Sequence, residues 1–264
     1  MIDEARYLYS VANCAEKLEL GRIGIEESIV YTIPYRDIAA IVHSCGSKPY
    51  STEDKRLAEG WILEHAYVID LATKRFGTVL PFSFDVIIRG DDHMIEQWLS
   101  ENYEGIKSEL ERMKGKSEYS VQIFCDTEIL SSKYLYKDWS IKELEDRAEK
   151  VGKGTAYLLR RKLDMKIREK VVAEIIRLSD EFGERIKALS DDVKVEKKKT
   201  SQLDKYRGKS LITSLSCLVS EDKVAPLGDV LEEINNLDGF AVRFTGPWAP
   251  FSFVNIRGAN EAGA

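Results

Sequence analysis

The sequence has little of several features that define other protein classes. No uncharged apolar run approaches the roughly 18 residues that a membrane span requires, and the N-terminus carries acids where a secretory signal carries bases. Its 17 glycines and 6 prolines among 264 residues are too few for a collagenous or low-complexity chain. The cysteines are too scattered for a disulfide framework or paired metal-ligand spacing. We therefore expect an ordered cytoplasmic protein with reduced thiols at Cys14, Cys45, Cys125 and Cys217.

Charge is unevenly distributed along the chain. The whole sequence has 39 basic and 45 acidic side chains, a net charge of −6, which argues against a dedicated nucleic-acid binder. Residues 137–209 hold 21 of the bases and 15 of the acids, a net charge of +6, so the remainder carries −12. Such a basic segment is either a solvated helix face or an arm that docks an acidic or self-complementary partner.

The first part of the chain predicts a sheet covered by two helices. Runs of β-branched and aromatic residues alternate with glycine or proline breaks. A capping-box pattern at residues 51–54 and an acidic cap at residues 91–92 precede apolar residues at helical spacing. This order indicates an α+β domain over residues 1–116. The predicted strands cover residues 6–12, 28–33, 38–43 and 78–88, and the predicted helices run from 51 to 77 and from 91 to 113.

The second part predicts a split βαβ arrangement with a long helical arm, over residues 117–264 with the arm at 139–207. A strand at 119–125 is followed by a helical region that restarts at Thr155. Apolar positions from Val171 to Val193 then step by 4, 3, 4, 4, 3 and 4, a coiled-coil-like seam that we expect to pack on a neighbouring helix. The remaining elements are a strand at 210–220, a helix with Pro226 in its first turn, and a strand at 240–245.

No motif of catalysis or cofactor binding is present. His43 and Cys45 share one face of a strand, but two ligands do not make a metal site. The run from Gly152 to Thr155 imitates a phosphate cradle, yet it lacks the preceding strand and favours a hinge or a helix restart. Arg160 and its neighbours are equally ordinary residues of a polar helix face. We therefore expect no catalytic, cofactor-binding or metal-ligating residues.

An aromatic segment follows the last predicted strand. Gly246 and Pro247 predict a turn, and Pro250 adds a second constraint. The rings of Trp248, Phe251 and Phe253 form either a lid over the local core or hot spots for a partner, and the sequence leaves both open.

These residues carry a resemblance to the gas vesicle protein L/F family (GvpL/GvpF). Residues 245–254, Thr-Gly-Pro-Trp-Ala-Pro-Phe-Ser-Phe-Val, resemble the family's C-terminal signature, with Ala249 in place of a proline and Phe251 in place of a tyrosine. Residues 152–157 with Arg160 and Arg161 are similar to the family's glycine-rich entry to a helix. The opening Tyr-Leu-Tyr strand and residues 78–81 also fit, whereas Ser-Phe-Asp at 83–85 departs from the family's Arg-Phe-Gly.

The resemblance implies a non-enzymatic accessory or minor structural protein of gas vesicles, the hollow shells that give some prokaryotes buoyancy. It implies a role in assembly, particularly nucleation, through binding the hydrophobic shell protein or other accessory proteins, and a first domain like a modified ferredoxin fold. Neither a cofactor nor a membrane partner is implied. The candidate partner-binding residues are Gly152, Gly154, Tyr157, Arg160, Gly246, Pro247, Trp248, Pro250, Phe251 and Phe253.

Two other functions stay open at this point. The basic arm is compatible with a nucleic-acid or ribosome-associated module, whose affinity would fall steeply with salt. An enzyme acting on a small anion at residues 152–162 is a third reading, but the segment offers neither a general base nor a nucleophile.

Overall fold

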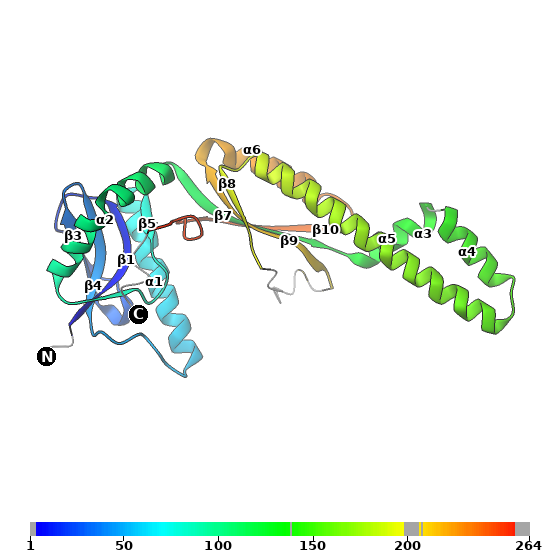
Figure 1. The fold of residues 1–264 in the computed structure, drawn as a ribbon, viewed down its shortest axis with the longest axis horizontal. Helices are drawn as coiled ribbons and strands as arrows, with labels where there is room; N and C mark the ends of the chain where they lie inside the picture. Colours follow the sequence, from blue (N-terminus) through cyan, green and yellow to red (C-terminus); the bar gives the residue numbers. More distant parts are fainter. Residues whose placement is uncertain (1–3, 138, 198–205, 207, 257–264) are drawn as a thin grey trace. The chain divides into compact units, whose positions relative to one another are not determined.

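The computed structural model describes residues 4–137, 139–197, 206 and 208–256. The chain divides into two compact units, and Figure 1 labels most of their elements. Residues 1–118 and 247–264 make the first unit, and residues 119–246 make the second. The predicted mixture of helix and sheet is confirmed. The sequence-based division placed everything after residue 116 in a second domain, whereas the described residues from Pro247 onward group with the first unit.

A six-stranded sheet forms the centre of the first unit. Its strand order is β2-β3-β4-β1-β5, and β6 pairs with β1 as well. The central strand β1 is buried from Ala5 to Ala12, because partners flank both its edges and a helix covers each face. The strands are β1 (Ala5–Asn13), β2 (Glu19–Arg22), β3 (Ile29–Tyr35), β4 (Ile38–Cys45), β5 (Val79–Pro81) and β6 (Ile87–Arg89).

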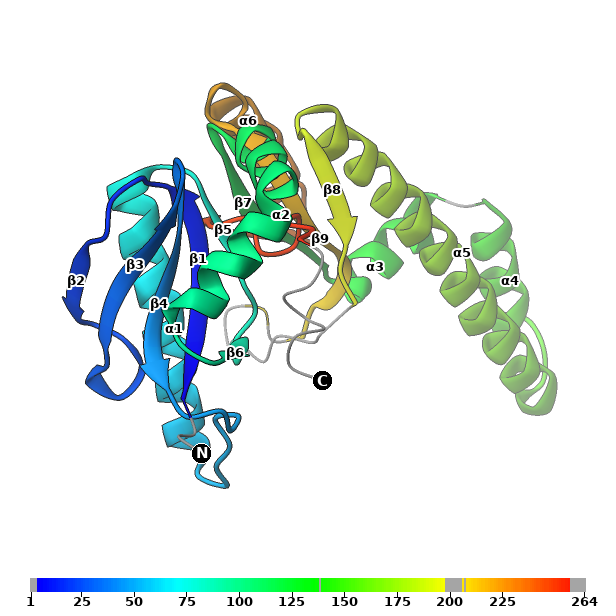
Figure 2. The same cartoon turned by 60° about the vertical axis from the view of Figure 1, so that its left-hand side comes forward.

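Two long helices, α1 (Lys55–Phe76) and α2 (Asp92–Met113), lie on opposite faces of this sheet, as Figure 2 shows. Each begins at an aspartate that satisfies free backbone donors of the first turn. The Asp54 carboxylate accepts from the backbone N–H of Arg56 at 2.8 Å, and that of Asp91 accepts from the N–H of His93 at 3.1 Å. Both predicted helix starts are therefore close to the observed ones.

Three details of the first sheet differ from the prediction. The short strand β2 was missed, and the run at 78–88 is two short strands, β5 and β6, separated by a turn. Strand β3 does not stop at Pro34 but continues to Tyr35. Because β2 pairs with β3 only as far as Tyr31, the missing N–H of Pro34 removes no bond on that side.

The second unit is a four-stranded sheet with helices, in the strand order β10-β7-β9-β8. In chain order this is the split βαβ pattern, with three helices in the first crossover. The elements are β7 (Lys116–Cys125), α3 (Thr127–Lys137), α4 (Trp139–Glu149), α5 (Lys153–Ala188), β8 (Asp192–Val195), β9 (Ser210–Ser220), α6 (Glu221–Asn235) and β10 (Phe240–Trp248).

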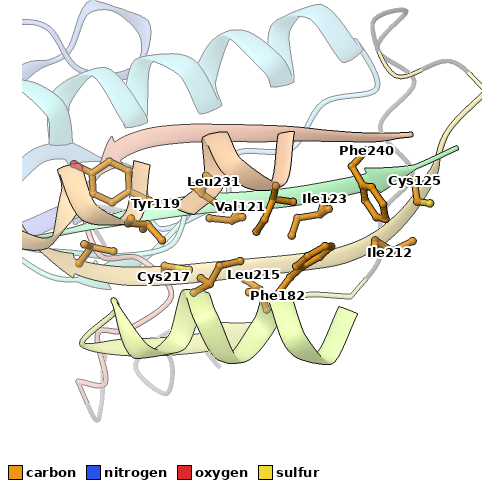
Figure 3. Packing of buried hydrophobic residues seen from close by; sticks show 14 of the residues in the cluster. Tyr119, Val121, Ile123, Cys125, Phe182, Ile212, Leu215, Cys217, Leu231 and Phe240 are labelled. Carbon is orange, nitrogen blue, oxygen red and sulfur yellow. The ribbon is translucent and has the colours of Figure 1, made fainter. Parts of the chain in front are cut away.

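The seam of α5 packs in one cluster with the sheet and α3, and not on one neighbouring helix alone as expected. Figure 3 shows Phe182 pointing from α5 toward Phe240, and the two rings meet edge to face with centroids 5.5 Å apart. Val171 and Ile186 of the same seam join one cluster with apolar residues of the sheet such as Leu215. A helix that packs on a sheet has apolar residues along one side, and so does a helix that packs on another helix. The spacing of apolar residues alone therefore did not distinguish the two kinds of packing.

The predicted boundaries of the second unit also need correction. Helix α5 ends at Ala188, and the β-branched Val193 lies in the edge strand β8, opposite Cys217 of β9, rather than in the helix. Helix α3 was missed. Helix α6 begins at Glu221, which makes Pro226 its sixth residue rather than a first-turn proline. Of the predicted arm at 139–207, residues 198–205 and 207 lie outside the described residues, and the helices occupy only 139–149 and 153–188.

Candidate partner-binding surfaces

Residues 247–254, which we name the closing segment, belong to the first unit and comprise the end of β10 followed by a turn at residues 251–253. Gly246, just before it, has a φ of 135°, a backbone conformation that L side chains rarely adopt, so glycine is required there. The carbonyl of Pro250 accepts bonds from the backbone N–H groups of Phe253 and Val254 at 3.0 and 3.1 Å. The turn therefore follows Pro250, and the turn predicted at Gly246 and Pro247 is wrong, because both residues lie within β10.

Two charged side chains hold the closing segment in place. The Glu118 carboxylate accepts bonds from both the backbone N–H and the hydroxyl of Ser252, at 2.8 and 2.6 Å. Arg112 donates to the carbonyl oxygen of Phe253 at 2.6 Å and is itself paired with Glu109. Charge-assisted bonds of this kind are stronger than neutral ones, so the segment is firmly attached. Sequence reasoning missed Glu118 and Arg112, because nothing near them in the sequence points to residues more than a hundred positions away.

The aromatic side chains of the closing segment point in two directions. Phe253 is 3% exposed, and Pro250 is also buried, so these residues close the local core. Trp248 is 56% exposed and Phe251 is 41% exposed. The buried position that a lid requires and the exposed position that a hot spot would require are thus both occupied, by different residues.

A buried network of tyrosines and histidines lies in the core beside Phe251, whose ring centroid is 6.4 Å from that of His65. The Tyr7 hydroxyl is 2.9 Å from Nδ1 of His65. The Tyr9 hydroxyl is 2.8 Å from Nδ1 of His43, whose Nε2 is 3.0 Å from the hydroxyl of Tyr50. Strand β1 thus links α1 and β4 through directional bonds as well as apolar contact.

The bonds around His65 fix its protonation. Its Nε2 donates to the carbonyl oxygen of Phe82 at 3.1 Å, so Nε2 carries the proton and Nδ1 accepts from Tyr7. The Tyr7 oxygen in turn accepts from the backbone N–H of Asp85 at 2.9 Å. Every polar atom in this chain of bonds is satisfied by a neutral imidazole.

Burial keeps the network uncharged near neutral pH. It lowers the pKa of His43 and of His65 to about 4, and it raises the pKa of Tyr50 to about 12. Burial likewise raises the pKa values of Tyr7 and Tyr9. A general base for acid–base chemistry would need a pKa near the working pH and access to a substrate, and these buried groups have neither.

The metal site considered from the spacing of His43 and Cys45 has no free imidazole nitrogen. Both ring nitrogens of His43 are within hydrogen-bond distance of tyrosine hydroxyls. In the part of the chain that the structure describes, no three histidine, cysteine or acidic side chains gather as a metal site would require. Among the same residues, no helix is long and apolar enough to cross a membrane.

A second surface lies where α4 turns into α5. Gly152 precedes α5 with extended backbone, Gly154 lies in the first turn, and the carbonyl of Gly152 accepts from the N–H of Ala156 at 2.9 Å. A side chain at either glycine would meet open space, so packing within the described chain requires neither glycine. An open cleft of about 640 Å³ is lined here by Ala148, Glu149, Val151, Lys153, Ala156, Tyr157 and Arg160.

The predicted site residues therefore fall into two separate sets. Gly152, Gly154, Tyr157 and Arg160 belong to the α4–α5 turn of the second unit, where the Tyr157 ring is exposed. The predicted site residues from Pro247 to Phe253 belong to the closing segment of the first unit. Each set includes an exposed aromatic ring, Tyr157 near the start of α5 and Trp248 at the end of β10.

Comparison with known proteins identifies relatives along nearly the whole chain. A family model described as gas vesicle synthesis protein GvpL/GvpF matches residues 5–255. Gas vesicle protein L1 of Halobacterium salinarum is 32% identical over 256 residues, which cover 96% of this chain and 91% of that protein. Gas vesicle protein L of Haloferax mediterranei is 32% identical over 233 residues, which cover 87% of this chain and 72% of that protein.

Two crystal structures share the fold. Gas vesicle protein GvpF of Anabaena sp. PCC7120 superposes with a TM-score of 0.73 at 18% identity, covering 97% of this chain and all of that one. GvpF of Microcystis aeruginosa superposes with a TM-score of 0.62 at 17% identity, covering 96% and 99%. At these identities the structures support the fold, and the family rests on the sequence matches.

Proposed function

Because the chain belongs to the gas vesicle synthesis protein GvpL/GvpF family, and so has a gas vesicle-related role, we propose that it acts in gas vesicle assembly. In this proposal it is a non-enzymatic accessory or minor structural protein that acts during nucleation in the cytoplasm. It binds the hydrophobic shell protein, other accessory proteins, or both, and stays associated with the growing vesicle.

The observation that carries the proposal is that some residues of the closing segment are buried and fix its backbone while others remain exposed. Phe253 and the bonds to Glu118 and Arg112 fix the backbone, while Trp248 and Phe251 remain exposed on it. Exposed aromatics on a preordered backbone lose little conformational entropy on binding, which suits them as anchors for an apolar partner. An apolar shell subunit would otherwise aggregate before assembly, so an accessory protein that covers it has a clear physical task.

The test is a pair of truncations within the same segment. Trp248→Ala should leave the thermal midpoint almost unchanged and weaken shell-protein binding by about 2 kcal/mol, or roughly thirtyfold. Phe253→Ala should instead cost about 3–5 kcal/mol of folding stability, because it empties a buried site. Binding by purified shell protein, thermal unfolding and vesicle formation in cells are measured on the same variants.

Tyr67→Ala is the matched control, because Tyr67 is a similarly exposed aromatic, at 53%, on α1 of the same unit. It should leave binding and vesicle formation intact. Undiminished shell-protein binding and normal vesicles in Trp248→Ala would refute the assignment of this surface.

A further inference from the structure

Helix α5 carries a second apolar line besides the seam buried against the sheet. Leu158, Met165, Val172 and Ile176 are spaced by 7, 7 and 4 residues. At 3.6 residues per turn, steps of seven return to within about 20° of the same direction, so the four side chains lie along one side of the helix. We name these four residues the outer stripe.

The outer stripe is exposed along its whole length. Its side chains are between 55% and 65% exposed, whereas Leu163, Val171, Phe182 and Ile186 of the inner side are buried. From residue 158 to 176 the helix rises about 27 Å, or five turns, the length of helix that one partner helix would contact. Single exposed apolar residues are ordinary, but four in one line on one helix make a candidate contact surface.

The charges around the stripe indicate what it contacts. Between Lys153 and Val172 the helix carries seven lysines and arginines but only two acids. Arg161, Lys162 and Arg168 lie between the stripe residues in sequence, and none of the three makes an ion pair with any described residue. The C-terminal half of α5 differs, since Arg177 there is paired with Glu174 and Glu181. The stripe is thus flanked by more basic than acidic side chains, and its flank has a net positive charge.

We propose that the outer stripe docks an acidic amphipathic helix of a partner protein. Apolar side chains at heptad spacing would fill the line from Leu158 to Ile176, and acidic side chains at the flanking positions would face Arg161, Lys162 and Arg168. The proposal concerns the second unit alone and does not depend on the function proposed for the closing segment.

A second copy of this chain fits the stripe less well. Parallel pairing would bring the two basic segments together along their whole length, where like charges repel. Antiparallel pairing about Ile167 would place Arg168 of one copy beside Lys166 of the other, near the middle of the contact. An acidic partner meets neither difficulty.

The experiment uses the full chain and a designed peptide probe. The probe is a fluorescent helix of three heptads with leucine at the a and d positions and glutamate at e and g. One control peptide scrambles the same residues, and another carries lysine in place of glutamate. Fluorescence anisotropy should show saturable binding of the acidic helix and at least tenfold weaker binding of both controls.

Variants of the chain locate the binding on the stripe. Met165→Glu should weaken binding of the acidic peptide at least tenfold. The double variant Arg161→Glu with Arg168→Glu should weaken binding to the same degree and should also reduce the dependence of that binding on salt concentration. Ala188→Glu, which adds the same charge at the end of α5, should leave binding unchanged. Circular dichroism confirms that every variant retains its helices, because the substituted side chains are exposed.

Three results would overturn the proposal. The first is absence of saturable binding by the acidic helix, or equal binding by the scrambled peptide. The second is binding that Met165→Glu does not alter. The third is a dimer of the wild-type chain, detected by light scattering, that Met165→Glu converts to a monomer, because the stripe would then serve a second copy instead.

Discussion

The two units are held together by different kinds of core. The first unit is crossed by hydrogen bonds among Tyr7, Tyr9, His43 and His65, all of them buried. The core of the second unit is a cluster of aliphatic and aromatic side chains around Phe182, with no histidine. Directional bonds fix the relative positions of strands and helices, whereas apolar packing fixes mainly volume. The first core should therefore respond to pH and to the loss of single hydroxyl groups, and the second core only to changes of volume or charge.

The largest effect is expected from a charge in the second core. Phe182→Asp removes a fully buried ring and adds a carboxylate without a partner, so the free energy of unfolding should fall by more than about 5 kcal/mol. Ile176→Asp places the same charge on the exposed side of the same helix and should cost less than about 1 kcal/mol. Urea unfolding of both variants measures the difference, and similar losses would show that the inner side of α5 is not a core.

Between pH 7 and pH 5 a pH dependence should appear in the first unit only, because all three histidines lie there. The folded pKa of about 4 for His43 and His65 is below the unfolded value of 6.5, so the unfolded state binds more protons between these limits. The stabilisation is complete above pH 6.5 and is lost as pH falls toward 4.

Between pH 7 and pH 5 this loss should amount to about 2 kcal/mol for each buried histidine. Hydrogen exchange followed by mass spectrometry reports the two units separately, and amides of β1 should lose protection while those of β9 do not. His93→Gln is the control, because the His93 side chain is 79% exposed and its loss should leave the profile unchanged. Equal loss of protection in both units would contradict the comparison.

The smallest effect compares one hydroxyl group in each unit. Tyr9→Phe leaves Nδ1 of His43 and the buried N–H of Ile25 without their shared partner, which should cost about 1–3 kcal/mol. Tyr119→Phe removes a hydroxyl for which the described structure shows no hydrogen bond, while its ring still stacks on Phe244, so stability should change by less than about 0.5 kcal/mol. Thermal unfolding of the two variants measures the difference, and equal shifts of the thermal midpoint would contradict the distinction between the two cores.

Patterns that depend on neighbours in sequence were predictable. The capping-box pattern at residues 51–54, the cap at Asp91 and the helical spacing of apolar residues located α1 and α2 within a few residues, although the observed cap of α1 is Asp54. The seam of α5 was identified as apolar on one side, which is what local periodicity reports. The short edge strands β2 and β8 were not found, since four residues hold too little pattern and their pairing depends on distant strands.

The candidate site was predicted as a list of residues and not as a surface. The sequence identified Trp248 and Phe253 together, because both are aromatic and close to prolines. Which of them is buried depends on Glu118 and Arg112, and contacts over such separations leave no local signal. The hydrogen bonds of His43 and His65 were not predicted, since partners 34 and 58 positions away in the sequence leave no local signal either.

The discontinuity of the first unit has a consequence for how the protein is made. A nascent chain that has emerged only to Glu118 already contains β1 to β6 with α1 and α2, but it lacks the closing segment that covers part of their core. The second unit is continuous in sequence, so it can fold as soon as it has left the ribosome. The unit that begins first is thus completed last, and during that interval the apolar surface later covered by Pro250 and Phe253 is open to chaperones or to wrong contacts.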